Sequence, residues 1–155
     1  MTRVRLVSTL ARVFCGAVFL IHGAPKIFDL KEAVNFFVSV HVPGWLAIPV
    51  AVLEFFGGIL LLAGFVTRIL AGLFMIEMAG AALFVHRAAG WDVFGGGYEY
   101  NIALILLLLA VLLIGPGPLS VDGAIGWGRR RRPEPEPVFE PVTETELDVE
   151  GDEPK

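Results

Sequence analysis

The chain has 155 residues, of which 55% are hydrophobic and 18% are charged, and its mean hydropathy is +0.72. Soluble domains average about 25% charged residues, so this composition excludes an ordinary soluble domain and predicts a small integral membrane protein. The net charge of −4 comes from residues 129–155, and no basic face with interleaved aromatic residues indicates nucleic-acid binding. Cys15 is the only cysteine, which excludes an intrachain disulfide and a Cys-x-x-Cys redox or zinc site.

Four apolar runs are long enough to cross a bilayer, which takes about 20 helical residues. They cover residues 6–24, 44–66, 69–85 and 98–115. Each is predicted to be a helix because lipid cannot satisfy free backbone polar groups. Pro25 is expected to end or kink the first helix near His22. The predicted fold class is therefore all-α, an integral membrane four-helix bundle formed by residues 1–128.

The distribution of lysine and arginine predicts the orientation in the membrane. With both termini in the cytoplasm, seven basic residues lie on the inner side and only Lys26, Lys31 and Arg87 on the outer side, as the positive-inside rule requires. The arginine run at 129–132 is interpreted as a basic anchor that touches anionic lipid. The rest of residues 129–155 is acidic and rich in proline, which predicts a disordered cytoplasmic tail; a docking peptide around Phe139 is the alternative.

Three ionisable residues are expected near the middle of the bilayer, on three different helices. At about 1.5 Å of rise per residue, Arg12, Glu54 and Glu77 all lie about 13–15 Å from the nearest membrane boundary. Ionisable groups at such depth are functional candidates. One arginine neutralises one carboxylate, so we expect Arg12 to pair with Glu54 or Glu77 while the other acid is protonated or exchanges a proton. The alternative is a contact that only fixes helix packing.

A second polar set is expected at the outer boundary of the membrane. The aromatic residues around it predict a pocket for a ligand with a polar head and an apolar tail, whereas the alternative is that the histidines are simply solvated. Haem ligation by two of these histidines would need opposed imidazoles, which nothing in the sequence fixes. No metal site is predicted, and His41 is expected to be solvated. The members of the set are His22, Lys26, His86, Glu99 and Asn101.

Short motifs in a fixed order carry a resemblance to a known family. They are Arg12, Gly16, Phe19, His22-Gly23, Lys26 and Phe28; Pro43-Gly44; Glu54-x-x-Gly57-Gly58, Gly64 and Thr67-Arg68; His86; Gly97-Tyr98-Glu99-Tyr100-Asn101; Gly115-Pro116-Gly117; and Leu119-Ser120-x-Asp122. Over about residues 8–123 the chain thereby resembles the DoxX family of small bacterial membrane proteins. The resemblance implies a four-helix bundle in the cytoplasmic membrane, and a part in membrane redox chemistry.

The resemblance also implies which residues and partners matter. Relatives are linked to thiosulfate:quinone oxidoreductases and to membrane complexes that handle oxidative and thiol stress with soluble partners. Seven positions match the family pattern, whereas Glu77 rests on the depth argument alone. The matching positions are Arg12, His22, Lys26, Glu54, Arg68, His86 and Glu99.

Two hypotheses of function follow. In the first, the chain is a quinone-interacting subunit of a membrane redox complex, and His22, Glu99 or the midplane acids exchange protons with the quinone head. The sequence has no flavin, haem or iron–sulfur motif, so electrons would come from a partner. In the second, it is a non-catalytic anchor or scaffold that recruits soluble enzymes through its tail. Whether the chain is itself an enzyme, and whether it forms a homo-oligomer, are left open.

Overall fold

The computed structural model describes residues 3–127, and within them every regular element is a helix. The prediction of an all-helical fold is therefore confirmed. The arginine run and the predicted disordered tail lie outside the described residues. The α-helices are α1 (Arg3–Phe28), α2 (Leu30–Ser39), α3 (Ala47–Val52), α4 (Gly58–Ala63), α5 (Thr67–Ala81), α6 (Glu99–Ile114) and α7 (Val121–Ala124).

Two of the predicted spans are helices interrupted by π-helical turns. A turn over Leu53–Gly57 joins α3 to α4 within the continuous helix Gly44–Ala63, and a turn over Ala82–His86 extends α5 as far as Ala89. Together with α1, these are three helices long and apolar enough to cross a membrane. The fourth predicted span forms α6, which is apolar but has only 16 residues.

The sequence analysis expected Pro25 to end or kink the first helix. In the structure the helix does not end there but continues to Phe28. A proline has no amide hydrogen, so only one bond of the helical ladder is lost. The carbonyl of Pro25 then accepts from the amide of Asp29 at 2.9 Å. Asp29 in turn caps α2, because its side chain accepts from the amide of Glu32. The segment between the first two predicted spans therefore contains a helix that the sequence analysis missed.

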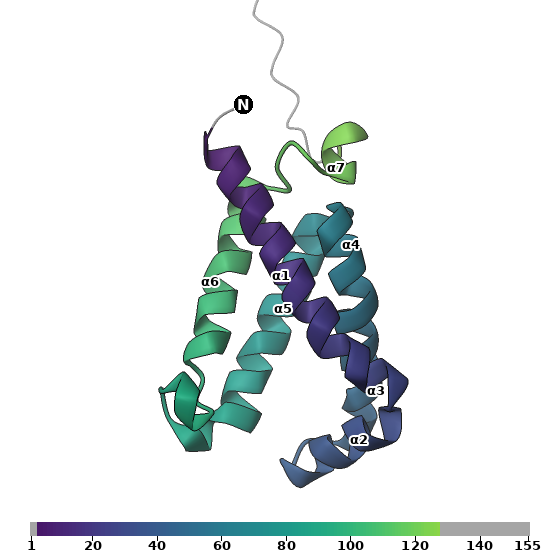
Figure 1. The fold of residues 1–155 in the computed structure, drawn as a ribbon, viewed down its shortest axis with the longest axis vertical. Coiled ribbons are helices and arrows are strands. Elements are labelled where there is room, and N and C mark those ends of the chain that lie inside the picture. Colours follow the sequence, from purple (N-terminus) through teal and green to yellow (C-terminus); the bar gives the residue numbers. More distant parts are fainter. Residues whose placement is uncertain (1–2, 128–155) are drawn as a thin grey trace, which may run out of the picture.

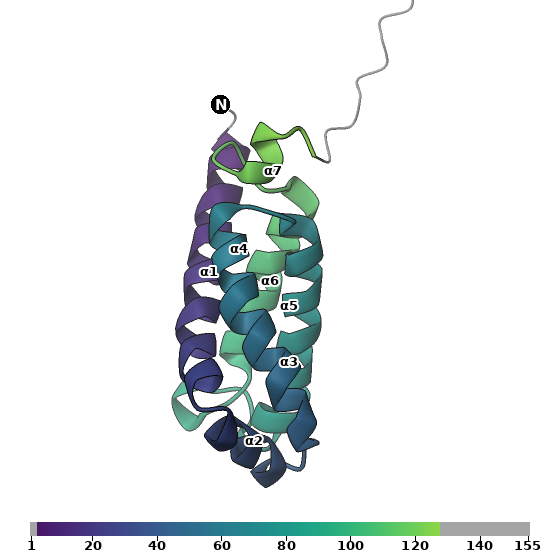
Figure 2. The same cartoon turned by 90° about the vertical axis from the view of Figure 1, so that its right-hand side faces the viewer.

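The helices converge at one end of the molecule and diverge at the other. The N-terminal end of α1 and α7 lie together at one end, whereas α2 lies at the opposite end (Figures 1 and 2). We call these the closed end and the open end. In Figure 1, the pair α5 and α6 separates from α2 and α3 toward the open end. At the closed end, the Ser8 hydroxyl donates to the carbonyl of Gly115 and ties α1 to the end of α6.

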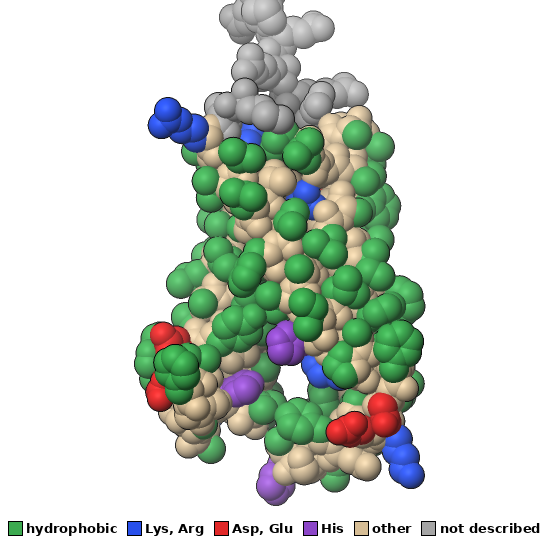
Figure 3. All heavy atoms as spheres, viewed as in Figure 1, with side chains coloured by type: hydrophobic (Ala, Val, Ile, Leu, Met, Phe, Trp, Pro, Cys, Tyr) green, Lys and Arg blue, Asp and Glu red, His purple; other side chains and the backbone are tan. Residues whose placement is uncertain are grey.

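A thin apolar core holds the bundle together. The rings of Phe19 and Phe74 stack with 3.7 Å between their centroids, and Leu61 and Leu108 beside them are fully buried. The outer faces of the helices carry large exposed apolar side chains (Figure 3). Such side chains are stable facing lipid, and their distribution fits a protein embedded in a membrane.

Glycine allows α1 and α4 to approach closely. A Cβ atom on Gly16 would lie 2.9 Å from the amide nitrogen of Leu62, and one on Gly58 would lie 2.7 Å from the amide nitrogen of Leu20. Only a residue without a side chain fits at either position. Small residues bring membrane helices together in this way, so α1 and α4 form one tightly packed pair.

Candidate functional site

A cavity of about 710 Å³ lies between the diverging helices at the open end. Figure 3 shows the molecule hollowed there, with histidine and basic side chains at the wall. The volume falls within the range of about 300–1,000 Å³ typical of small-molecule sites. Most of the wall is apolar, with contributions from α1, α2, α3, α5 and α6. The polar residues that line it include His22, Lys26, Glu54, Glu77, His86 and Asn101.

An ion pair between Lys26 and Glu54 joins α1 to the first π-helical turn. The Lys26 Nζ atom donates to both carboxylate oxygens of Glu54 at 2.5 Å. The Glu54 side chain is only 4% exposed, so the lysine is its charge partner in a nearly dry site. The close approach depends on Gly23, because a Cβ atom there would lie 2.7 Å from the Cβ atom of Glu54.

Glu77 completes a group of three charged side chains on three helices. Its carboxyl group lies close enough to Glu54 and Lys26 to interact electrostatically with both. Its Oε2 atom is buried and has no hydrogen-bond partner among the described residues. Two carboxyl groups thus lie beside one ammonium, so the group is charge-balanced only when one of the acids carries a proton.

The expected ion pair between Arg12 and one of these acids is wrong. Arg12 is 1% exposed and donates to four backbone carbonyls near the closed end instead. Its Nη1 atom bonds Leu61 at 2.6 Å and Leu62 at 2.5 Å, and its other nitrogens bond Pro116 and Leu119. Carbonyls in the last turn of a helix have few amide partners within the helix, so the guanidinium finds acceptors where α4 ends, although the Leu61 carbonyl also accepts from the amide of Gly64 at 3.1 Å. Of the three predicted midplane residues, the structure brings only Glu54 and Glu77 together.

Asp122, like Arg12, is a buried charged residue whose side chain forms hydrogen bonds with the backbone at the closed end. Its carboxylate accepts from the amides of Val66 and Thr67 at 2.9 and 2.8 Å, and its own amide donates to Gly64. Val66 has φ +46°, a left-handed conformation that is rare for a β-branched residue. The two hydrogen bonds hold this strained turn in place. Asp122 appeared in the sequence only as a motif position, so its capping role was missed.

Four of the five residues predicted at the outer boundary do line the cavity. They are His22, Lys26, His86 and Asn101. Glu99 is not among the lining residues; its Oε2 atom accepts a long bond of 3.4 Å from the amide of Val93. The ring Nδ1 of His86 lies 2.7 Å from the carbonyl of Gly96, so the second π-helical turn is tied to the loop before α6.

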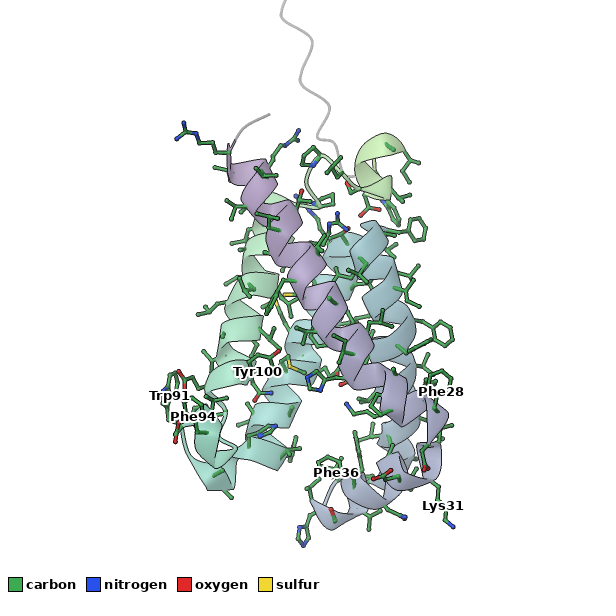
Figure 4. The ribbon with its side chains drawn as sticks, in the orientation of Figure 1. Phe28, Lys31, Phe36, Trp91, Phe94 and Tyr100 are labelled. Carbon is green, nitrogen blue, oxygen red and sulfur yellow. The ribbon has the colours of Figure 1, made fainter. Side chains whose placement is uncertain are left out.

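The structure adds residues that the sequence analysis did not place in the cavity. Phe36 on α2 and Tyr100 on α6 line it from opposite sides (Figure 4). His41, expected to be merely solvated, also lines it. Trp91 and Phe94 lie at the outer edge of the molecule instead. The available signal for α2 was the helical spacing of apolar residues between the first two predicted spans, at Leu30, Ala33, Val34 and Phe37.

The described residues contain no group of three histidine, cysteine, aspartate or glutamate side chains that could hold a metal ion. The site is therefore organised around hydrogen bonding, charge and apolar surface. Its donors are the lysine ammonium, the histidine rings and the Asn101 amide, and its free acceptor is the Glu77 oxygen. Asn101 is 5% exposed, and its amide reaches only the Met78 sulfur, at 3.7 Å.

Fold and site together define a small helical membrane protein with a largely apolar cavity between its helices, lined by a few polar side chains. A family model described as DoxX matches residues 7–87. The chain belongs to the DoxX family.

Curated relatives agree with this assignment. The chain is 31% identical over 123 residues to "Putative oxidoreductase CatD" of Bacillus subtilis, covering 79% of this chain and 90% of that protein. It is 30% identical over 122 residues to "Inner membrane protein YphA" of Escherichia coli, covering 73% and 86%. An uncharacterized protein of Haemophilus influenzae is 28% identical over 114 residues. No solved structure matches the chain.

Proposed function

We propose that this protein is the quinone-binding membrane subunit of a redox complex, and that the cavity at the open end holds the quinone. The observation that carries the proposal is the buried group of Lys26, Glu54 and Glu77, which faces a largely apolar cavity of about 710 Å³. The name of the Bacillus subtilis relative supports a redox role.

The residues present suit the chemistry of such a ligand. A quinone head offers carbonyl oxygens, which accept hydrogen bonds, and His22, Lys26 and Asn101 supply donors along the wall. The apolar wall, including Phe36 and Tyr100, suits an isoprenoid tail. A quinone carries electrons and protons together. The described chain offers the proton site, and a partner protein supplies the electrons.

The acids have distinct roles in this proposal. Glu54 is the fixed charge, because both of its oxygens are bonded to Lys26. Glu77 is the acid to which we assign the exchangeable proton, because its buried Oε2 atom has no hydrogen-bond partner among the described residues. His22 lies one helical turn before Lys26 and is exposed toward the cavity, where it orients the ligand.

We place the protein in the bacterial inner membrane with both termini in the cytoplasm. The lysine and arginine distribution supports this orientation, and the printed name of the Escherichia coli relative supports the membrane. The cavity then opens toward the outer side of the membrane, because α2 and the loop before α6 lie at that end.

Lipid extraction from the mildly purified full-length protein, followed by mass spectrometry, tests the proposal. We expect stoichiometric quinone in the wild type and its loss in Glu54→Gln and in His22→Ala. Glu32→Gln is the matched control, since this carboxylate is exposed on α2 and does not line the cavity. Absence of quinone from the wild type, together with a soluble enzyme that is lost when residues 129–155 are deleted, would contradict the proposal and favour the scaffold hypothesis.

A further inference from the structure

A second cavity, of about 700 Å³, lies at the closed end. Its wall is formed by the beginnings of α1 and α5, the end of α6 and the loop that leads to α7. Arg5 projects from α1 and Arg68 from α5, and both side chains are exposed. The cavity is independent of the one at the open end, and the proposed function does not use it.

The charge of this second cavity is unbalanced. Within residues 3–127 neither Arg5 nor Arg68 forms an ion pair. Asp122 also lines the cavity, but it is 5% exposed and its two oxygens already accept from two backbone amides. Two guanidinium groups without a carboxylate partner therefore face one concave surface. Arginine in this arrangement binds phosphate oxygens strongly, because its planar fork forms paired hydrogen bonds.

The turn at the end of α6 holds one of these arginines in position. Gly115 has φ +97°, and a Cβ atom on it would lie 3.4 Å from the Nη2 atom of Arg68. The guanidinium group of Arg68 therefore lies over the turn. Because Gly115 has no side chain, the guanidinium group of Arg68 can pack against the turn at the edge of the cavity.

Apolar side chains continue the wall of the same cavity. Ile69 is 58% exposed, Ile114 is 37% exposed and Trp127 is 50% exposed. A free phosphate ion would leave this apolar surface uncovered. A molecule with a phosphate at one end and a hydrocarbon chain at the other would cover both parts. The beginning of a membrane-spanning helix is also the depth at which lipid phosphates lie.

We propose that this cavity binds an anionic phospholipid. Arg5 and Arg68 contact the phosphate, and an acyl chain lies along Ile69 and Ile114. Basic pockets between membrane helices on the cytoplasmic side bind such headgroups in this way. The binding is a property of the folded bundle, distinct from the general attraction of the arginine run at 129–132 for a charged surface.

Native mass spectrometry of the full-length protein tests the proposal, with phosphatidylglycerol and phosphatidylcholine titrated in parallel. We expect the wild type to retain phosphatidylglycerol in preference to phosphatidylcholine. The affinity for phosphatidylglycerol should fall about fivefold for each arginine removed. The variants are Arg5→Gln and the double variant that also carries Arg68→Gln. The control carries Lys31→Gln and Arg87→Gln, which remove the same charge at the open end. Its affinity should equal that of the wild type. Arg5 has no side-chain partner in the described structure, so Arg5→Gln alone keeps the test valid if the double variant unfolds.

Three results would overturn the proposal. The first is undiminished preference for phosphatidylglycerol in a folded Arg5→Gln or double variant. The second is an equal loss in the control, which would make the effect one of total charge. The third is complete displacement of the lipid by inorganic phosphate, which would make this a site for a free anion. Replacing arginines 129–132 by glutamine should leave the preference in place, and its disappearance there would likewise contradict the assignment.

Discussion

Lys26 reaches both carboxylate oxygens of Glu54 at 2.5 Å, across the interface between α1 and the first π-helical turn. The contact exists because α1 continues past Pro25 and because Gly23 brings the two backbones together. The lysine lies toward the open end of its helix, and the glutamate lies deep within the bundle. Their ion pair therefore links the mouth of the cavity to its buried acids.

A double-mutant cycle measures the strength of this pair. Lys26→Met leaves the buried Glu54 carboxylate without its charge partner and should lower the free energy of unfolding by about 3 kcal/mol. Glu54→Gln should cost less, because Lys26 is 26% exposed and Glu77 remains beside it. The double variant should recover part of the loss, with a coupling energy of about 1–3 kcal/mol. Unfolding in mixed detergent micelles gives all four values. Additive losses would show that the two residues do not interact.

Substitution of Gly23 tests the close approach of the two helices. A Cβ atom there would lie 2.5 Å from the amide nitrogen of Phe55, so Gly23→Ala should destabilise the protein by about 1–3 kcal/mol through overpacking. Gly72→Ala is the control, since a Cβ atom at that helical position meets nothing within 4 Å. It should be neutral or stabilising by up to about 1 kcal/mol. Equal thermal stability of the two variants would rule out the close contact.

Replacement of Arg12 by lysine should be harmful although the charge is kept. A lysine ammonium cannot reproduce the planar fork that reaches four carbonyls on two segments of the chain. Loss of one or two of these charged hydrogen bonds should cost about 2–3 kcal/mol, measured as the free energy of unfolding. Arg87→Lys, at an exposed position of the open end, should change it little. A stable Arg12→Lys variant would mean that position 12 needs only a positive charge.

Cysteine labelling in intact cells tests the orientation. Cys15 is fully buried and should remain unlabelled, so the native chain is a clean background. A membrane-impermeant maleimide should modify Lys31→Cys, on exposed α2, without disruption of the cells. Ala124→Cys, on α7, should react only after lysis. The reverse pattern would place the closed end outside and contradict the proposed topology.

The sequence was sufficient to predict the helices and much of the cavity, because apolar length and depth depend on position along the chain. His22, Lys26, His86 and Asn101 were expected at one level, and they share one cavity. Helix tilt and rotation were not predictable, since they depend on packing between side chains. The depth estimate counted the rise per residue along helices taken as perpendicular to the membrane. It therefore placed Arg12 at the same depth as Glu54 and Glu77.

The partners of Arg12 show a further limit of the sequence. They are backbone carbonyls where α4 ends and where the chain turns before α7, and the Leu61 carbonyl among them also accepts from the amide of Gly64. Every residue carries such a carbonyl, so no residue type marks the acceptors in advance. The same holds for the Val66 and Thr67 amides that Asp122 caps, since the left-handed turn that exposes them follows from the tertiary fold.

Because the helices diverge from the closed end, a small rotation there would displace the open end by a larger distance. At the closed end, the hydrogen bond from Ser8 to Gly115 ties α1 to the end of α6. The far end of α6 lies about 24 Å from there, so a rotation of roughly 5° about the attachment moves the wall of the cavity by about 2 Å. A substitution at Ser8 or Gly115 that changed this angle would therefore alter the width of the cavity mouth, although neither residue lines that cavity.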